Sequence, residues 1–412
     1  MKAAAQRARA AVSGLRAQLG RRPDFYGELA RLLRVRRQDV LDANRADLAA
    51  AASENLSAAG RDRLSLDERR VEAMAQMVLA VAAQPDPLGR VLEGRTLPNG
   101  MELSKHSVPI GVIGFIYESR PNVTVEAACL AVKSGNAVLL KGGREAAQSN
   151  ILLETLCRVA LHKAGLPEDL VQLLDSADRA SARELVKLTG LVDLVIPRGG
   201  KGLIATVVSE SRVPVIKHYE GNCHVYVHAG ADLDMALAIV DNAKTQRPGV
   251  CNAAESLLVD RAVLKDFLPR FAQRMGERKV ELRACGECLP LLPGAKPASE
   301  EDWAAEYLDL ILSVRAVGGL EEACHHIERY GSHHTDAIVT RDLEAARLFT
   351  ELVDSAVVLV NASTRFNDGG QFGLGAEIGI STDRLHARGP MGAGELTTYK
   401  WIAYGRGHVR AE

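Results

Sequence analysis

From residue 108 onward the chain alternates short apolar, β-branched runs with amphipathic segments of helix length, and this alternation limits the fold more than any other feature. The first series of apolar runs is VPIGVIGFIY, AVLL, LVQLL, LVDLVI and VPVI. Such runs, separated by helix-length segments, predict β-α-β units and a doubly wound parallel sheet. We therefore expect an α/β fold whose ligands bind in the crevice at the carboxyl ends of the strands.

A second series of runs predicts a second α/β domain. Its strands are expected at CHVYVHA, ESLLVD, LILSVRAV, TDAIVT and AVVLVN, with helices at 232–244, 261–275 and 342–353. Before about residue 95, apolar residues recur at three- and four-residue spacing, which predicts a helical lead-in. We expect residues 1–222 to form this lead-in and a cofactor domain, residues 223–374 a catalytic domain, and residues 375–412 a return to the cofactor domain.

Two segments predict strands outside these sheets. The range 97–108 contains the turn signal Pro98-Asn99-Gly100 and is expected to form a β-hairpin, and TTYKWIAYGR near the C-terminus is expected to form another strand. Isolated strands leave backbone groups unpaired unless they pair with each other or with a partner subunit. This predicts a homo-oligomer.

Charge and hydropathy exclude several classes of protein. The 412 residues carry 51 Lys and Arg against 52 Asp and Glu, so nothing indicates a nucleic-acid partner. No apolar run approaches the roughly 18 residues of a membrane helix, and no secretory signal is present, so we expect a cytoplasmic protein without a membrane partner. Residues 1–23 hold six basic residues and no acid before residue 24, which fits either a transit peptide or basic arm, or an Ala-rich helix with a solvated basic face.

Seven cysteines, an odd number without paired spacing, indicate reduced thiols. Cys251 lies in a predicted tight loop, RPGVCN, where Lys244 and Arg247 would favour the thiolate that makes cysteine a nucleophile. By itself it could equally be a small buried hydrophobe. Cys285 and Cys288 have the spacing of a zinc half-site, with a second half conceivable at Cys324, His325 and His326, but two incidental loop thiols fit better and we expect no metal.

Two glycine loops follow predicted strands and open predicted helices. They are Lys141-Gly142-Gly143-Arg144 and the loop PRGGKG, which contains Gly199 and Gly200. Bare backbone, cations and a helix N-terminus suit the phosphates of a nucleotide cofactor. Neither loop is a GxGxxG fingerprint, and each alone also fits ordinary turn chemistry.

Three segments are more specific. YESRPNVT at 117–124, the loop PGVCNAAE, and RGPMG at 388–392 followed by TTYKW resemble the gamma-glutamyl phosphate reductases, or glutamate-5-semialdehyde dehydrogenases, of the aldehyde dehydrogenase superfamily. The likeness runs from about residue 60 to the C-terminus. It implies a Rossmann-type cofactor domain, a second α/β catalytic domain and a β-hairpin flap for oligomerisation.

The resemblance also implies a reaction. NADPH would reduce L-glutamyl 5-phosphate to L-glutamate 5-semialdehyde with release of phosphate, the second step of proline biosynthesis from glutamate. Cys251 would carry the glutamyl group as a thioester. Association with a glutamate 5-kinase, which makes the labile acyl phosphate, is a further expectation.

Individual residues take roles through the same resemblance. The backbone N–H of Cys251 and the amide of Asn122 would stabilise the oxyanion. Lys141 would reach the adenine-side ribose, Arg144 favours NADPH over NADH, and Glu306 would hold the nicotinamide ribose. Substrate anions would meet Arg120, Lys217, Arg247 and Arg365.

The sequence departs from the superfamily pattern at two places. Glu220 is a third catalytic candidate, since it lies near the position of the base that activates water in aldehyde-oxidising relatives, although an ungapped match puts His218 there. Gly370-Gln371 stands where bulkier or basic residues are usual. Two alternatives stay open: an NAD(P)-dependent aldehyde dehydrogenase that hydrolyses its thioester, and a non-catalytic binding or assembly protein that keeps the fold.

Overall fold

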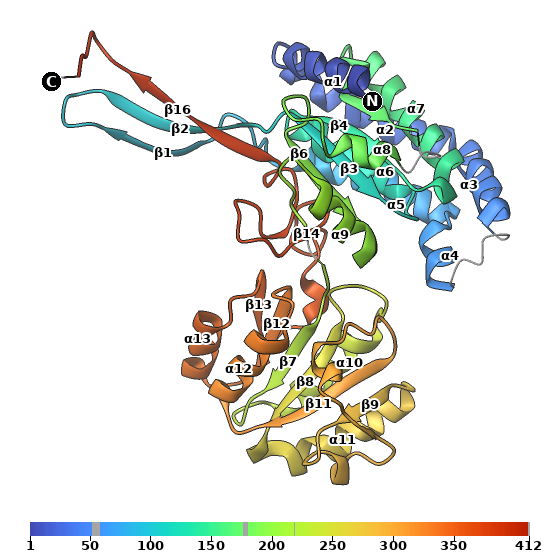
Figure 1. Ribbon diagram of the computed structural model, residues 1–412, viewed down its shortest axis with the longest axis vertical. Coiled ribbons are helices and arrows are strands. Elements are labelled where there is room, and N and C mark those ends of the chain that lie inside the picture. The colour runs from blue at the N-terminus through green and yellow to red at the C-terminus, as the bar shows by residue number, and fades with distance from the viewer. Residues whose placement is uncertain (52–57, 176–179, 218, 411–412) are drawn as a thin grey trace. The chain divides into compact units, whose positions relative to one another are not determined.

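The computed structural model describes residues 1–51, 58–175, 180–217 and 219–410, in two compact units (Figure 1). Unit 1 comprises residues 1–217, 373–379 and 391–412, and unit 2 comprises residues 218–372 and 380–390. Among the described residues, no helix is long and apolar enough to cross a membrane. The predicted division of cofactor and catalytic roles between parts of the chain stays a prediction.

Unit 1 is built on a parallel sheet with the strand order β5-β4-β3-β6. Its core strands are almost entirely buried, which explains why they read as continuous apolar runs in the sequence. The strands are β3 (Val112–Tyr117), β4 (Ala137–Lys141), β5 (Val171–Leu173) and β6 (Leu194–Arg198). The helices are α1 (Lys2–Leu15), α2 (Arg22–Val35), α3 (Arg37–Ala51), α4 (Ala58–Leu64), α5 (Glu68–Ala83), α6 (Asn122–Lys133), α7 (Ala147–Lys163), α8 (Ala180–Leu185) and α9 (Lys201–Glu210).

Two of the expected strands of unit 1 differ in the structure. The run VPIGVIGFIY is divided at Gly111, whose φ of +135° is a backbone conformation that L side chains rarely adopt. A Cβ atom there would lie 2.1 Å from Oδ2 of Asp193, which accepts a hydrogen bond from the N–H of Val112. The run VPVI forms only an isolated bridge between Val195 and Val215.

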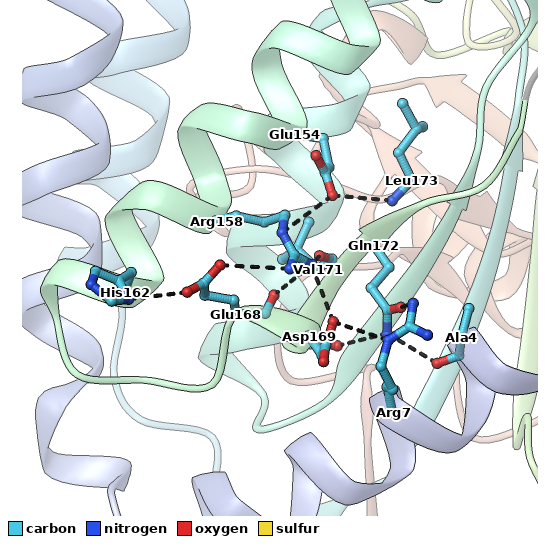
Figure 2. Close-up of polar contacts among 10 residues, drawn as sticks. All are labelled: Ala4, Arg7, Glu154, Arg158, His162, Glu168, Asp169, Val171, Gln172 and Leu173. Carbon is cyan, nitrogen blue, oxygen red and sulfur yellow. Dashed lines mark hydrogen bonds and ion pairs between the residues drawn. The ribbon is translucent and has the colours of Figure 1, made fainter.

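The basic N-terminal segment is helix α1, and it packs on the sheet of unit 1. Its residues Ala5, Ala8, Ala11, Val12 and Leu15 are buried. Figure 2 shows Arg7 directed at β5 and the short 3-10 helix before it (Glu168–Leu170). Its Nη2 donates to Oε1 of Gln172 at 2.9 Å, and its Nε lies 3.5 Å from Oδ1 of Asp169. Gln172 in turn donates to the carbonyl of Ala4 at 3.0 Å. Of the two interpretations of residues 1–23, the described structure matches the Ala-rich helix, with Arg7 paired to Asp169 and Gln172 instead of fully solvated.

The strands outside the main sheets pair with each other, and the hairpin spans residues 91–109 instead of the expected 97–108. They form the antiparallel sheet β1-β2-β16, from β1 (Val91–Thr96), β2 (Glu102–Pro109) and β16 (Thr397–Tyr404). The turn between β1 and β2 includes Gly100 at φ +84°. Figure 1 shows the three strands as an arm extending from unit 1, and Tyr399 and Trp401 on β16 are exposed. The role of this sheet in oligomerisation stays a prediction.

Unit 2 is built on a seven-stranded parallel sheet with the order β10-β9-β11-β8-β7-β12-β13. All five expected strands are present, while the short strands β9 and β10 had no clear signal in the sequence. The strands are β7 (Cys223–Val227), β8 (Ala254–Asp260), β9 (Glu281–Ala284), β10 (Lys296–Pro297), β11 (Ile311–Val317), β12 (Thr335–Val339) and β13 (Val357–Val360). The helices are α10 (Leu233–Thr245), α11 (Leu264–Glu277), α12 (Leu320–Tyr330) and α13 (Leu343–Leu352). The pair β14 (Ile380–Ser381) and β15 (Gly389–Pro390) completes the unit.

Side chains alternate between two cores on the faces of this sheet. Val225 and Val227 pack with α10 and α11, whereas Tyr226 between them packs with α12 and α13. Successive residues of a strand point to opposite faces, so helices cover both sides. Loops at the ends of the strands are therefore the places left for chemistry.

Candidate active site

Cys251 lies in the loop between α10 and β8, at the amino end of β8, and its side chain is half-buried. The loop closes with a hydrogen bond from the N–H of Ala253 to the carbonyl of Val250 at 3.0 Å. A Cβ atom at Gly221 would lie 1.9 Å from the carbonyl oxygen of Cys251, so only glycine lets the two segments approach this closely. The thiol is thus held on a tight loop against a second strand end, as a nucleophile requires.

Candidate residues of unit 2 gather at the amino ends of its strands. Glu306 precedes β11, and its Oε1 accepts a hydrogen bond from the N–H of Gly221, just before β7, at 2.9 Å. His334 directly precedes β12. Parallel strands place all their amino ends at one edge, so segments far apart in the sequence meet beside Cys251. We expected ligands at the carboxyl ends of strands, and in this unit the candidate nucleophile lies at the opposite edge.

Arg365 lies in the electrostatic neighbourhood of Cys251. Its Nε donates to Oε1 of Gln246 at 2.8 Å, and its Nη1 donates to Oδ1 of Asn252, the residue after Cys251. Burial lowers the pKa of Arg365, against the opposing influence of Asp368 and of Cys251 itself. The guanidinium lines a hollow of about 240 Å³, whose other walls are Asn242, Gln246, Phe366, Asp368 and Gln371.

A second predicted cation, Arg247, is exposed and close enough to Arg365 to lower its pKa. Two guanidinium groups at one site are typical of anion recognition. An acyl phosphate that also carries a carboxylate presents two such anions.

Lys244 does not supply the free positive charge that we expected beside Cys251. Its Nζ donates to Oε2 of Glu255 at 2.6 Å, and both side chains are fully buried. Burial lowers the pKa of Lys244 and raises that of Glu255 to about 7, since each loses hydration in its charged form. The charge of Lys244 is therefore balanced inside the core, and the thiolate needs another partner.

His334 is a site residue that the sequence reasoning missed. It is fully buried next to Cys223 and Cys251, with Nδ1 3.6 Å from Sγ of Cys223. The sequence shows only that His334 immediately precedes the predicted strand TDAIVT. Its proximity to Cys251 could not be inferred without the strand order of the sheet.

Unit 1 has a pocket of about 770 Å³ at the carboxyl ends of β3 and β4. Lys141 is the last residue of β4, and the backbone of Gly142 and Gly143 follows it into the pocket wall. Further lining residues come from α8 and α9, among them Arg183, Leu203 and Thr206. This volume is within the range of small-molecule and cofactor sites, and it lies where parallel α/β sheets bind nucleotides.

The two glycine loops fit a phosphate-bearing ligand in different ways. A Cβ atom at Gly142 would lie 2.3 Å from the amide nitrogen of Asn150, so glycine is needed there for packing, while nothing approaches a Cβ atom at Gly200 within 4 Å. Gly200 is the N-cap of α9, whose ten residues start at Lys201, and its N–H donates to Oε2 of Glu118 at 2.9 Å. The bare backbone at the start of α9 therefore already binds a carboxylate oxygen, the same kind of acceptor that a phosphate offers.

Glu145 is an acid in the same pocket as Lys141. Its Oε1 accepts hydrogen bonds from the N–H and hydroxyl of Ser119 at 2.6 and 2.8 Å. Arg144 lies in the pocket wall as well. The pocket thus offers Lys141 and Arg144 to a phosphate, with Glu145 engaged by Ser119.

The zinc alternative does not fit the geometry. Cys285 and Cys288 lie with the core that α10 and α11 cover, whereas Cys324 lies with the core on the α12 and α13 face. Within the described ranges, no group of three or more His, Cys, Asp or Glu side chains is placed to hold a metal ion. The two sulfur atoms of the CxxC pair are 3.6 Å apart.

The remaining predicted residues divide between the units. Asn122 is the first residue of α6 in unit 1, where its Nδ2 donates to Oε1 of Glu126 at 2.7 Å. Arg120 and Lys217 also belong to unit 1, and Glu220, half-buried, belongs to unit 2. His218 lies outside the described residues. The roles of these residues stay predictions.

Comparison with known proteins identifies the family. Residues 1–284 match the model of the aldehyde dehydrogenase family. The chain is 50% identical over 371 residues, 90% of each protein, to a gamma-glutamyl phosphate reductase from Thermoanaerobacter pseudethanolicus. This chain belongs to the gamma-glutamyl phosphate reductases of the aldehyde dehydrogenase family.

A solved member of the gamma-glutamyl phosphate reductase family has nearly the same structure. The crystal structure of the reductase from Thermotoga maritima superposes with a TM-score of 0.95 at 44% identity, over 99% of each chain. The glyceraldehyde-3-phosphate dehydrogenase of Methanocaldococcus jannaschii, solved in complex with NADP, shares the fold at a TM-score of 0.68 and 16% identity, over 98% of this chain and 94% of that one. The predicted family and the predicted α/β fold are confirmed.

Proposed function

We propose that this protein reduces L-glutamyl 5-phosphate to L-glutamate 5-semialdehyde with NADPH and releases inorganic phosphate, through a thioester on Cys251. One observation carries the proposal: relatives that share half of the residues along 90% of the chain are named for this reaction. The half-buried thiol of Cys251, which interacts electrostatically with Arg365, supports it. The reaction is the second step of proline biosynthesis from glutamate.

The residues of unit 2 account for the acyl chemistry. The Cys251 thiolate attacks the acyl carbon, a C–S bond forms, and the C–O bond to phosphate breaks, so that phosphate leaves with the electron pair. Arg365 and Arg247 are proposed to bind the anionic groups of the substrate in and beside the 240 Å³ hollow. Asp368, in the same wall, has the charge that the substrate's ammonium group requires. After reduction the C–S bond breaks, and the thiolate is restored as the aldehyde departs.

The pocket of unit 1 is proposed to hold NADPH, which supplies the hydride when bound. Lys141 and Arg144 would pair with the phosphate that distinguishes NADPH from NADH, and the loop of Gly199 and Gly200 would bind the pyrophosphate at the start of α9. Glu306 is proposed to hold the nicotinamide ribose. The oxyanion would be stabilised by the backbone N–H of Cys251 and by Asn122, and one such donor is typically worth about 3 kcal/mol.

Several finer expectations stay proposals. They are a cytoplasmic location, assembly into a homo-oligomer through the sheet β1-β2-β16, and association with a glutamate 5-kinase. Arg120 and Lys217 are proposed substrate contacts. Glu220 is proposed as a further catalytic residue, although activation of water, its role in aldehyde-oxidising relatives, would waste the thioester in the reductive direction.

The test is reduction of NADP by glutamate semialdehyde, with and without phosphate. We expect turnover only when phosphate is present, and slower turnover with NAD. Turnover without phosphate would instead favour an aldehyde dehydrogenase that hydrolyses its thioester.

Cys251→Ala should abolish turnover while NADP still binds. Cys324→Ala is the matched control, since this thiol lies in the core on the α12 and α13 face, and it should keep activity. Near-normal turnover of Cys251→Ala would refute the assignment of the nucleophile.

A further inference from the structure

The surroundings of Cys251 contain a buried histidine that the proposed reaction leaves without a role. Cys223 is the first residue of β7, His334 directly precedes β12, and β7 and β12 are neighbouring strands. The thiol of Cys223 donates to the carbonyl oxygen of Cys251 at 3.1 Å and lies 3.6 Å from Nδ1 of His334. Cys251 also acts electrostatically on the imidazole and favours its charged form. Three sulfur and nitrogen side chains from separate strand ends thus meet at the candidate nucleophile.

A chain of hydrogen bonds fixes the ring of His334. Its Nδ1 lies 2.7 Å from Oγ1 of Thr335, and that hydroxyl oxygen accepts a hydrogen bond from Nδ2 of Asn367 at 2.6 Å. The carbonyl of Asn367 accepts a hydrogen bond from Nδ2 of Asn252 at 2.8 Å, and Asn252 follows Cys251 in the sequence. The network therefore begins at the imidazole and returns to the nucleophile loop. It orients the base toward the nucleophile, as a catalytic pair requires.

The charges around the ring favour an imidazolium. Burial opposes a charge on His334, but the neighbouring thiols of Cys251 and Cys223 outweigh it and hold its pKa above the ordinary value. The other charged groups at this cluster are Arg365, which interacts with both thiols, and Asp336, which interacts with Cys223. Lys244 also faces Cys223, but its charge is balanced by Glu255. Glu306 adds a carboxylate at the neighbouring strand end, 2.9 Å from the N–H of Gly221.

We propose that His334 is the proton partner of Cys251, whose thiol proton it takes so that an imidazolium stabilises the thiolate. The proposal rests on the proposed function, because it supplies the thiolate that attacks the acyl phosphate. The proton moves once, from Sγ of Cys251 to the ring. It stays there while the thioester exists, and the thiolate that forms when the C–S bond breaks is again paired with the imidazolium. This takes the place of the cation that the sequence predicted at Lys244.

The test is alkylation of Cys251 by iodoacetamide as a function of pH, in the wild type and in His334→Gln. Only the thiolate reacts, so the midpoint of the rate profile reports the ionisation of Cys251. We expect a midpoint below pH 7 in the wild type and a shift toward the value of about 8.5 of a free thiol in the variant. At pH 6.5 the alkylation rate of the variant should fall about tenfold or more. A variant profile that coincides with the wild-type profile would overturn the proposal.

His333→Asn is the matched control. His333 has φ +56°, a conformation that Asn adopts readily, and its Nδ1 lies 3.2 Å from the carbonyl of Asp354, away from the thiols. Its profile should match the wild type. Alkylation must be assigned to individual peptides, because Cys285 is half-exposed and its side-chain hydrogen bond with Cys288 lowers its pKa to about 5.

A measurement on the unsubstituted histidine covers the case in which His334→Gln does not fold. The ultraviolet absorbance of a thiolate, taken as the difference between the wild type and Cys251→Ser, should persist below pH 7 if the pair exists. Absorbance that develops only above about pH 8, as in a free thiol, would overturn the proposal. Neither readout uses the substrate. A wild type that forms the Cys251–His334 ion pair but shows no phosphate-dependent turnover would therefore refute the proposed function and leave this proposal intact.

Discussion

A single substitution in the buried ion pair of Lys244 and Glu255 should lower the free energy of unfolding of unit 2. Nζ and Oε2 lie 2.6 Å apart, and both side chains are fully buried. Lys244→Met keeps a chain of similar length but leaves the Glu255 carboxyl without its cation. Breaking such a pair typically costs about 3–5 kcal/mol. We expect the free energy of unfolding of unit 2 to fall by this amount at pH 8.

The destabilisation caused by Lys244→Met should be smaller at lower pH, because the buried carboxyl of Glu255 can then bind a proton in the folded state. In the wild type, burial raises the pKa of Glu255 from its ordinary 4.5 to about 7 even beside the lysine, so the folded protein already gains a proton below that pH. In Lys244→Met the cation that favours the charged carboxylate is absent, so the pKa of Glu255 lies higher still. Above about pH 7 the folded variant therefore keeps a proton that the folded wild type and the unfolded chain have both lost. Its stability relative to the wild type should fall by about 1.4 kcal/mol per pH unit as pH rises through this window.

Urea unfolding followed by the fluorescence of Trp303 measures this effect. The chain has two tryptophans, and Trp401 belongs to unit 1, so a Trp401→Phe background isolates the signal of unit 2. Lys244→Met combined with Glu255→Gln is the control. Gln keeps an oxygen for the N–H of Leu308, 3.1 Å from Oε1 in the wild type, but has nothing to ionise. The double variant should show no extra pH dependence. If the single variant also follows the wild-type pH dependence, the reasoning is refuted.

Three further predictions follow from other sites. Cys288→Ala should move the alkylation midpoint of Cys285 up from about 5 toward 8.5, because the thiol that stabilises the Cys285 thiolate is lost; peptide mass after iodoacetamide treatment measures it, and an unchanged midpoint would contradict this cause. Arg158→Met should lower the free energy of unfolding of unit 1 by about 1–3 kcal/mol, since it removes hydrogen bonds to Asp169 and to the carbonyl of Val171, both 3.2 Å long (Figure 2). Urea denaturation checks it, and a change below about 0.5 kcal/mol, typical of an ordinary surface substitution, would mean that these contacts contribute little. Lys141→Ala should raise the KM for NADPH about tenfold and the KM for NADH much less; equal changes in steady-state assays would rule out a contact with the extra phosphate.

Both parallel sheets could be predicted because their strands are buried on both faces and so appear as uninterrupted apolar runs. The strand β9 could not be predicted from an apolar run, because only its alternate residues Leu282 and Ala284 are buried. The division of one apolar run at Gly111 depends on Asp193, 82 residues later, and no local pattern reports that contact. The helical lead-in was also predicted to extend to about residue 95, but β1 already begins at Val91, because its pairing with His106 lies outside any local window.

The sequence by itself determined the family, the two α/β series and the choice of Cys251, because these follow from local patterns and from motifs that are contiguous in the chain. Only the tertiary structure decided which side chains surround that thiol. Lys244, seven residues away, is paired with Glu255, while His334 reaches the site from 83 residues further on. The physical reason is the register of the parallel sheet, which places the amino ends of β7, β8 and β12 at one edge. Electrostatic interactions depend on distance in space and not on separation along the chain.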